Sequence, residues 1–344
     1  PAASHTVMLW GLGAFAVGLI CFEFSAVFNN AMMPSLVPRA ELGKLSGSSW
    51  ALGYIGGLIC LVAVLGFMVS NPGTGKTLLG NPPILALDPV NHEGDRASGP
   101  LSALWFIVFI IPLFLFTPDQ KRLNKASGAV TQSLKSLWQS IRGLPKHPSL
   151  FAFLTSSMLY RDALNGLYAF GGIYAAGVMQ WSIIYIGIFG ILANITGAIG
   201  AWLGGRADSR FGSKAVVTAS ILLLIITSIL IISTDPQHIL WAEVPVDSTL
   251  PNLLFFVCGG FIGAAGGALQ ASSRTLMVDQ ADPKKMTEAF GLYALSGRAT
   301  SFIAPLAIAF TTAAFASQRI GITPVIVLFA ISLLLLPKVH ARLT

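Results

Sequence analysis

The chain has 344 residues, of which 54% are hydrophobic and only 10% are charged. Soluble domains carry about a quarter charged residues, and a soluble chain of this length needs more charge to cover its surface. The net charge of +7 does not indicate nucleic-acid binding, because the basic residues do not gather on one soluble face. The composition therefore indicates an integral membrane protein and no nucleic-acid partner.

Nine apolar stretches are long enough to cross a bilayer, because a hydrocarbon core of about 30 Å needs roughly 20 helical residues. In chain order they are 7–30, 47–70, 99–117, 149–176, 180–204, 214–234, 251–274, 287–315 and 321–337. Gly259, Gly263 and Gly267 repeat at a spacing of four, which is typical of helices that pack closely in lipid. We therefore predict an all-α integral membrane bundle with nine spans.

The 21 Lys and Arg residues indicate the orientation of these spans. If the crossings alternate, one set of loops holds Arg39, Lys44, Lys121, Arg122, Lys125, Lys135, Arg142, Lys146, Arg206, Arg210, Lys214, Arg274, Lys284, Lys285, Lys338 and Arg342. The opposite set holds Lys76, Arg96 and Arg319. Loops rich in Lys and Arg stay on the cytoplasmic side. The C-terminus is thus predicted to be cytoplasmic and, with nine spans, the N-terminus outside.

A long basic segment, 118–148, divides the predicted spans into three (1–117) and six (149–344). Its apolar residues recur at helical spacing, and they are Leu134, Leu137, Trp138 and Ile141. This pattern predicts an amphipathic helix on the inner membrane surface, with a solvated linker as an equal alternative.

Several motifs that carry chemistry elsewhere are incomplete in this chain. The segment Gly73–Thr77 reads GTGKT, but a phosphate-binding loop needs a glycine where Ser70 stands. The histidines are scattered over different loops and termini, at positions 5, 92, 147, 238 and 340, so no metal-binding spacing exists. No nucleophile, base and acid can be grouped either. We therefore expect no metal, no cofactor and no enzymatic activity.

Four ionisable residues fall deep inside predicted spans, near the middle of the bilayer, where charge is costly and often functional. Glu23, Arg161, Asp162 and Arg298 all come out about 15–20 Å from the cytoplasmic ends, at 1.5 Å per residue. Their charges sum to zero, as in a charge-paired layer around a polar cavity that serves solute binding or proton coupling. The alternative is that the charges only fix helix packing. Further polar candidates at nearby levels are Asn30, Asn165, Tyr168, Asn194 and Gln270.

The segment 204–214, GGRADSRFGSK, resembles the cytoplasmic loop motif of the major facilitator superfamily. Its matching residues are Gly204, Asp208, Arg210, Gly212 and Lys214, and the motif's basic pair is reduced to Lys214 with Ser213 beside it. In this motif a short turn with glycine holds an acid near the positive N-terminus of another helix. The resemblance implies that these residues close an inner gate.

Further stretches resemble vacuolar-effluxer-like (autophagy-type) facilitators. They are 28–34 (FNNAMMP), 46–57 (SGSSWALGYIGG), 160–166 (YRDALNG), 266–274 (GGALQASSR) and 290–298 (FGLYALSGR). Such proteins have two six-helix halves, and this chain aligns from the fourth helix onward. The resemblance therefore implies that 1–117 is the remainder of the N-terminal bundle, without the first three helices. Asn29 stands where that family usually has Tyr, and Arg161 stands where it usually has Asn.

The resemblance implies a secondary transporter that works by alternating access around a site near the midplane. It implies export of small solutes, with amino acids the best single candidate. Protons are the candidate coupling ion, through Asp162 or Glu23, and uniport is the alternative. The compact loops favour a bacterial inner membrane over a vacuolar one. The rival interpretation is a non-transporting scaffold or an inactive fragment of a transporter.

Overall fold

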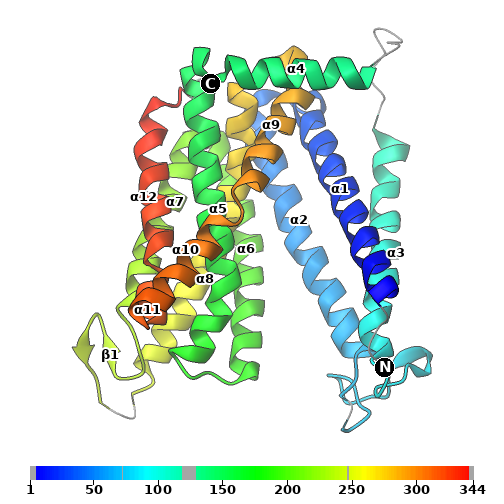
Figure 1. Cartoon of the computed structure of the whole chain (residues 1–344), viewed down its shortest axis with the longest axis vertical. Helices are drawn as coiled ribbons and strands as arrows, with labels where there is room; N and C mark the ends of the chain where they lie inside the picture. The colour runs from blue at the N-terminus through cyan, green and yellow to red at the C-terminus, as the bar shows by residue number, and fades with distance from the viewer. Residues whose placement is uncertain (1–4, 72, 118–128, 246–247, 341–344) are drawn as a thin grey trace. The chain divides into compact units, whose positions relative to one another are not determined.

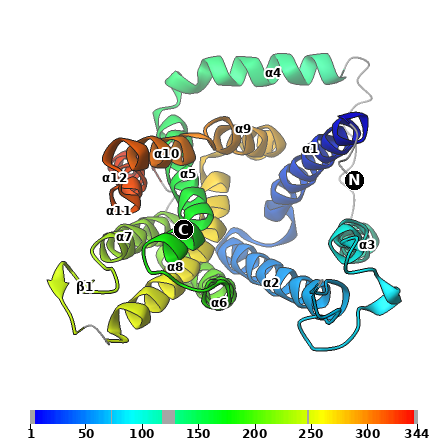
Figure 2. The ribbon, with the colours of Figure 1, turned by 60° about the horizontal axis from the view of Figure 1, so that its bottom comes forward.

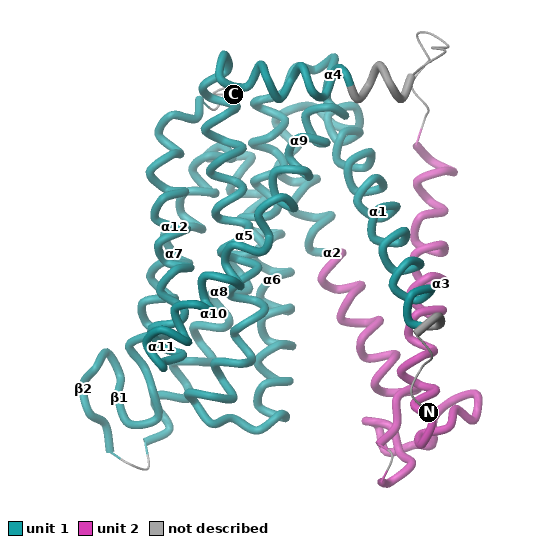
Figure 3. The backbone as a smooth tube through the Cα atoms, in the orientation of Figure 1, with its two compact units in different colours: residues 1–51, 133–344 teal, residues 52–132 magenta. Residues whose placement is uncertain are grey.

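The computed structural model describes residues 5–71, 73–117, 129–245 and 248–340, and the side chains of 8–71, 73–117, 135–245 and 248–340. The chain divides into two compact units, coloured separately in Figure 3. Unit 1 contains residues 1–51 and 133–344, and unit 2 contains residues 52–132. The units are described separately below. The predicted division at 117 and 148 stays a prediction.

Unit 1 is helical apart from one short hairpin (Figure 1). Its α-helices are α1 (His5–Leu36), α5 (Pro148–Gly177), α6 (Ile183–Phe211), α7 (Ser213–Ile232), α8 (Leu250–Gln280), α9 (Met286–Ala299), α10 (Ile303–Phe315), α11 (Gln318–Gly321) and α12 (Thr323–Leu335). Its 3₁₀ turns are η1 (Arg39–Glu41), η4 (Leu144–Lys146), η5 (Pro283–Lys285) and η6 (Leu336–Lys338). The hairpin pairs β1 (His238–Ile239) with β2 (Ala242–Glu243). The helix α2 (Leu42–Ala63) begins in unit 1, and α4 (Ala129–Gly143) ends there.

The core of unit 1 lies around α5, which is surrounded by α7, α8, α9, α10 and α12 (Figure 2). Tyr160, Phe153 and Leu164 of α5 are at most 2% exposed. The helices α6 and α8 approach closely through the predicted glycine repeat. A Cβ atom on Gly267 would lie only 2.2 Å from the carbonyl oxygen of Gly197, so only glycine permits this backbone contact.

Eight helical segments of the described residues are long and apolar enough to cross a membrane. They are Met8–Leu36, Arg39–Met68, Glu93–Phe116, Ile183–Phe211, Ser213–Ile232, Leu250–Gln280, Pro283–Phe315 and Gln318–Lys338. The prediction of an all-α membrane bundle is confirmed. The stretch 149–176 corresponds to α5, which has 30 residues but carries Arg161, Asp162 and Asn165, which lower its hydropathy. The count of nine spans stays a prediction.

Three predicted spans ended too early, and the first of them is 7–30, because α1 continues to Leu36. Because α6 continues to Phe211 and α8 to Gln280, Arg206, Arg210 and Arg274 are helical residues, and their placement in loops was wrong. The physical reason is that the residues beyond each apolar run still pack between helices. Asp208 of α6 is 8% exposed, and Leu276 of α8 is fully buried.

The predicted span 287–315 is a broken helix. The α-helix α9 ends at Ala299 and α10 begins at Ile303, with a turn at 300–302. Pro305 follows this turn, near the start of α10. Proline has no amide hydrogen to donate to the residue four positions earlier, so it favours a break at that point of the chain.

The helix α4 runs crosswise to the bundle helices (Figure 1). Leu137 and Ile141 pack against the core of unit 1, whereas Trp138 is 55% exposed with the guanidinium of Arg142 5.1 Å from its ring. The predicted amphipathic helix therefore exists, but two of its three described apolar residues, Leu137 and Ile141, cover protein. The remaining predicted segment, 118–128, and the Leu134 side chain lie outside the described residues, and contact with the membrane surface stays a prediction.

The loop between α7 and α8 is fixed to α11 by Asp235. Its carboxylate accepts hydrogen bonds from the Gln237 amide at 2.9 Å and from Arg319 Nη1 at 2.6 Å, and His238 Nδ1 lies 2.9 Å away. Burial on its own would raise the pKa of Asp235. The hydrogen bonds from His238 and Gln237, with the charge of Arg319, outweigh burial and hold this pKa below its usual range.

Unit 2 contains the end of α2, the π-helical turn η2 (Val64–Met68), the 3₁₀ turn η3 (Ile84–Ala86) and α3 (Glu93–Phe116). The helix α3 begins tightly against η2, because a Cβ atom on Gly94 would lie 2.3 Å from the Met68 carbonyl oxygen. The GTGKT segment begins in a turn, and its last residue, Thr77, forms an isolated bridge with Ser70. It does not join a strand to a helix, as a phosphate-binding loop does.

Candidate functional site

A cluster of polar contacts, centred on Arg274 of α8, joins segment 1–51 to segment 133–344, the other part of the chain in unit 1. The Arg274 guanidinium donates to the Ser46 carbonyl oxygen at 2.7 Å, the Ser49 hydroxyl at 2.8 Å and the Asn30 side-chain oxygen at 3.0 Å. A fourth bond, from Nε to the Ser46 hydroxyl, measures 3.1 Å. Ser46 in turn donates to the Ala271 carbonyl oxygen at 2.6 Å. One arginine therefore holds α1, α2 and α8 together.

The loop motif lies beside this cluster. Asp208 is buried and accepts a hydrogen bond from the Thr275 hydroxyl of α8. Its carboxyl carbon lies 2.9 Å from the point where a Cβ atom on Gly43 would be, in the first turn of α2. The acid of the motif is therefore next to the N-terminal end of another helix, where the macrodipole favours negative charge. Glycine at 43 leaves the space that the carboxyl group occupies.

The other motif residues have separate partners. Lys214 Nζ donates to the Val339 carbonyl oxygen at 2.7 Å, beyond the end of η6. The Arg210 guanidinium lies 5.3 Å from the ring of Phe211. Gly212 has φ +85° between α6 and α7, a conformation that favours glycine. Gly204 packs against Ala268, whose Cβ atom is 2.6 Å from the position of an added Cβ.

A second acid near the motif, Asp279, was not predicted. It forms an ion pair with Arg39 and accepts a hydrogen bond from the Ser213 hydroxyl at 3.2 Å. Asp208, Asp279, Arg39 and Lys214 line one pocket of about 820 Å³. Opposite charges from four elements thus meet at the end of the bundle where the basic residues gather.

The four predicted membrane charges do not share one cluster, although Arg298 lies in α9 and two of the others, Glu23 and Arg161, contact this helix. Arg298 Nε donates to a Glu23 carboxylate oxygen at 2.8 Å, and this ion pair links α9 to α1. The Arg298 side chain is 55% exposed and the Glu23 side chain 27%. The expected pairing across helices is therefore present for these two residues, in a partly open position.

Arg161 and Asp162 have partners on two different helices. Arg161 Nη1 donates to the Tyr293 carbonyl oxygen of α9 at 2.8 Å, and its guanidinium lies 4.3 Å from the Tyr293 ring. Asp162 is 1% exposed, and its Oδ2 accepts the Ala304 amide of α10 at 2.9 Å. Its Oδ1 is buried and has no hydrogen-bond partner among the described residues.

The remaining predicted polar residues are spread over several elements. Asn30 belongs to the Arg274 cluster. Asn194 donates to the Gly190 carbonyl oxygen of its own helix at 2.9 Å. Asn165 and Tyr168 are exposed, and Gln270 is half-buried. The structure therefore brings Asn30 to the predicted gate and leaves the roles of the other four residues as predictions.

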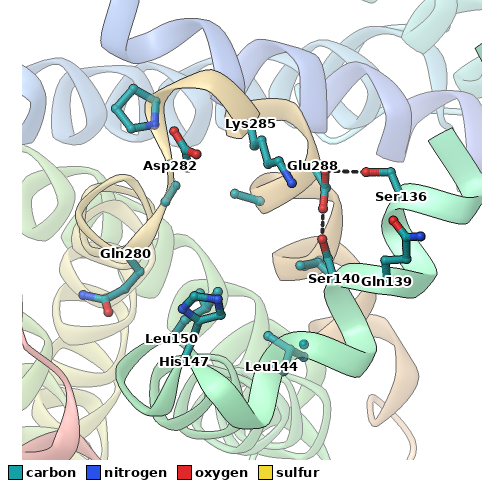
Figure 4. Close-up of a pocket in the computed structure, with 15 residues that line it drawn as sticks. Ser136, Gln139, Ser140, Leu144, His147, Leu150, Gln280, Asp282, Lys285 and Glu288 are labelled. Atoms are coloured by element: carbon teal, nitrogen blue, oxygen red, sulfur yellow. Dashed lines mark hydrogen bonds between the residues drawn. The ribbon is translucent and has the colours of Figure 1, made fainter. Parts of the chain in front are cut away.

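A pocket of about 530 Å³ lies where α4 crosses the start of α9 (Figure 4). Glu288 of α9 is held there by two serines of α4: Ser136 donates to it at 3.1 Å, and Ser140 donates to its other oxygen. His147 and Lys285 also line the pocket. The two serines fix α4 to the first turn of the helix that carries Arg298.

Sequence reasoning missed Arg274, Asp279 and Glu288 because each was placed in or near a loop. A signal existed for Arg274, since the apolar residues Leu276 and Met277 follow it at helical spacing. No signal in the sequence pairs Glu288 with α4. Among the described residues, no three His, Cys, Asp or Glu side chains group closely enough to hold a metal ion.

Comparison with known proteins finds relatives along nearly the whole chain. Residues 4–342 match the family model described as vacuole effluxer Atg22 like. An uncharacterized MFS-type transporter, YxiO of Bacillus subtilis, is 22% identical over 94% of this chain and 69% of its own length. Autophagy-related protein 22 of Cryptococcus neoformans is 22% identical over 86% of this chain and 50% of its own. Autophagy-related protein 22-1 of Neosartorya fischeri is also 22% identical, over 80% of this chain and 44% of its own. The chain thus spans about half the length of these fungal relatives.

Proposed function

Because this chain belongs to the Atg22-like vacuole effluxer family, a family of transporters and not of enzymes, we propose that it moves small solutes across a membrane by alternating access. We propose amino acids as the solutes and export as the direction. The family match and the names of the relatives support a transporter. The solute class rests on the resemblance to effluxers.

The observation that best supports this mechanism is the polar character of the contact between segments 1–51 and 133–344. Arg274, Asp208 and the Arg39–Asp279 ion pair all lie in it. Each polar contact contributes only about 0.5–3 kcal/mol net, because water replaces each partner when the two sides separate. Such a contact can open and close at small cost, as a gate must.

In the proposed cycle, this contact is the closed cytoplasmic gate. The Glu23–Arg298 ion pair lies further along α1 and α9 and is partly exposed. A zwitterionic solute has a carboxylate for Arg298 and an ammonium for Glu23, so it can replace each residue's partner. Exchange of the ion pair for the solute would couple binding to movement of α1 against α9.

Proton coupling is the second part of the proposal. Glu23 and Asp162 are the candidate carriers, because both are carboxylates in predicted spans. We place the protein in a bacterial inner membrane, with a cytoplasmic C-terminus and the start of this chain outside, in accord with the distribution of Lys and Arg.

The test is amino-acid flux in liposomes that contain the purified protein. We expect wild-type flux and its loss in Glu23→Gln, while Arg206→Met retains it. Arg206 is a matched control, because it bonds to a carbonyl of its own helix and lies over the Trp202 ring. Normal flux in both Glu23→Gln and Asp162→Asn would contradict a role for these carboxylates. Absence of flux for every amino acid, in well-folded protein, would favour the scaffold.

A further inference from the structure

The break between α9 and α10 is held from both sides by two neighbouring residues of α5. The turn at 300–302 separates a helix that ends at Ala299 from one that begins at Ile303. A break in a membrane helix leaves backbone groups without their usual partners, and burying such groups is costly. The structure therefore has to stabilise the two ends separately.

Arg161 holds the α9 side. Its guanidinium donates to the Tyr293 carbonyl oxygen and lies over the Tyr293 ring, which combines a charged hydrogen bond with a cation–π contact. It also lies directly on Gly297, where a Cβ atom would be 2.3 Å from Arg161 Nη1. Arg161 therefore touches α9 over its last two turns and fixes the direction in which that helix points.

Asp162 holds the α10 side. Its carboxylate accepts the Ala304 amide, which is in the first turn of α10 and lacks a helical acceptor. The side chain is buried, as is Ala304. The negative charge also faces the positive end of α10. Asp162 thus supplies the acceptor that the break removes.

We infer that Arg161 and Asp162 are positioning residues that hold the two sides of the α9–α10 break, so that α9 keeps the direction in which it presents Arg298 to Glu23 during transport. Arg298 is in the last turn of α9, next to the break. The orientation of α9 therefore sets the position of the Arg298 guanidinium relative to Glu23. Adjacent residues on one rigid helix are suited to this task, because their spacing fixes the spacing of the two ends. The inference rests on the proposed transport function.

The hold on α10 is tested by hydrogen exchange of the full-length protein in lipid nanodiscs, measured on peptides that contain Ala304. We expect exchange at least tenfold faster in Asp162→Ala. Asp162→Asn keeps an oxygen acceptor for the Ala304 amide, so its exchange rate should remain close to that of wild type. The matched control is Tyr160→Phe, since Tyr160 is equally buried on α5 but bonds to Ser273 of α8 at 2.7 Å. Wild-type exchange in Asp162→Ala, or the same acceleration in Tyr160→Phe, would overturn this part of the inference.

The hold on α9 is tested by flux kinetics in liposomes. We expect Arg161→Gln to lower the maximal rate at least tenfold and to leave KM within about twofold of wild type. Gly297→Ala keeps both charges but displaces the guanidinium, so it should reproduce the effect. A raised KM with an unchanged maximal rate would instead make Arg161 a solute ligand and would overturn the positioning role. If wild-type protein moves no amino acid, the transport proposal fails, while the exchange result still decides whether Asp162 holds the break.

Discussion

Replacement of Arg274 by Met should open the contact between segments 1–51 and 133–344. The guanidinium donates four hydrogen bonds across it, from 2.7 to 3.1 Å. Hydrogen bonds to charged groups contribute about 1.5–3 kcal/mol each, net of the water that they replace, and bonds that share one half-buried guanidinium are not additive. We therefore expect Arg274 to stabilise the closed contact by about 3 kcal/mol net. Since about 1.4 kcal/mol is a factor of ten, the ratio of closed to open protein should fall roughly a hundredfold.

The assay is the rate at which a maleimide labels Ser272→Cys, in a background whose natural cysteines Cys21, Cys60 and Cys258 are replaced. Ser272 is fully buried and lies beside Asp208 at this contact. If labelling follows opening, Arg274→Met should raise its rate by roughly two orders of magnitude. Arg274→Lys keeps the charge but cannot form the same set of hydrogen bonds, so its labelling rate should lie between those of wild type and Arg274→Met. Arg206→Met is the control.

The reasoning would be refuted by unchanged labelling in Arg274→Met, provided that the variant is folded and inserted. It would also be refuted by equal acceleration in Arg206→Met, because that residue bonds only within α6 among the interactions described. Labelling that rises without any change in flux would separate this contact from the transport cycle.

Three further predictions address other contacts. Gly47→Ala places a Cβ atom 2.4 Å from the Ala201 carbonyl oxygen, so it should weaken the same contact by about 1–3 kcal/mol and speed Cys labelling, whereas Gly53→Ala, in open space, should not. Because the pKa of Asp235 is lowered in the folded protein, its contribution to stability is complete above the ordinary pKa of 3.8 and disappears as the pH falls through the folded pKa. The Tm difference between wild type and Asp235→Asn should therefore be largest near neutral pH and shrink below about pH 4, whereas a constant difference would contradict the lowered pKa. Glu288→Ala removes the acceptor of both α4 serines and should speed tryptic cleavage after Arg142 severalfold, while equal cleavage rates would show that these bonds do not hold α4.

The membrane class and the helical character were predictable because they depend on composition and on the length of apolar runs. The positions at which the helices end were less predictable from the sequence. Arg274 ends an apolar run, but helical packing continues past it to Gln280, and hydropathy does not report packing between helices. The break at 300–302 had a sequence signal in Pro305, which the length of the apolar stretch outweighed.

The sequence predicted which residues belong to the candidate site better than it predicted which of them contact one another. A charge inside a span implies a partner, and Glu23 and Arg298 do pair across helices. Which partner is chosen depends on helix rotation and on residues far away in the chain. Asp162 contacts a backbone amide 142 residues later, and Arg274 contacts Ser46 228 residues earlier. Neither pairing follows from spacing.

The partners of Arg274 have a practical consequence for work with parts of the molecule. Ser46, Ser49 and Asn30 all belong to segment 1–51, and so does Arg39, which pairs with Asp279. A recombinant piece that starts at 149 would retain Arg274 without these acceptors, and an uncompensated guanidinium in an apolar setting is strongly destabilising. We expect such a piece to aggregate when made alone and to be rescued by coexpression of the preceding segment as a separate polypeptide.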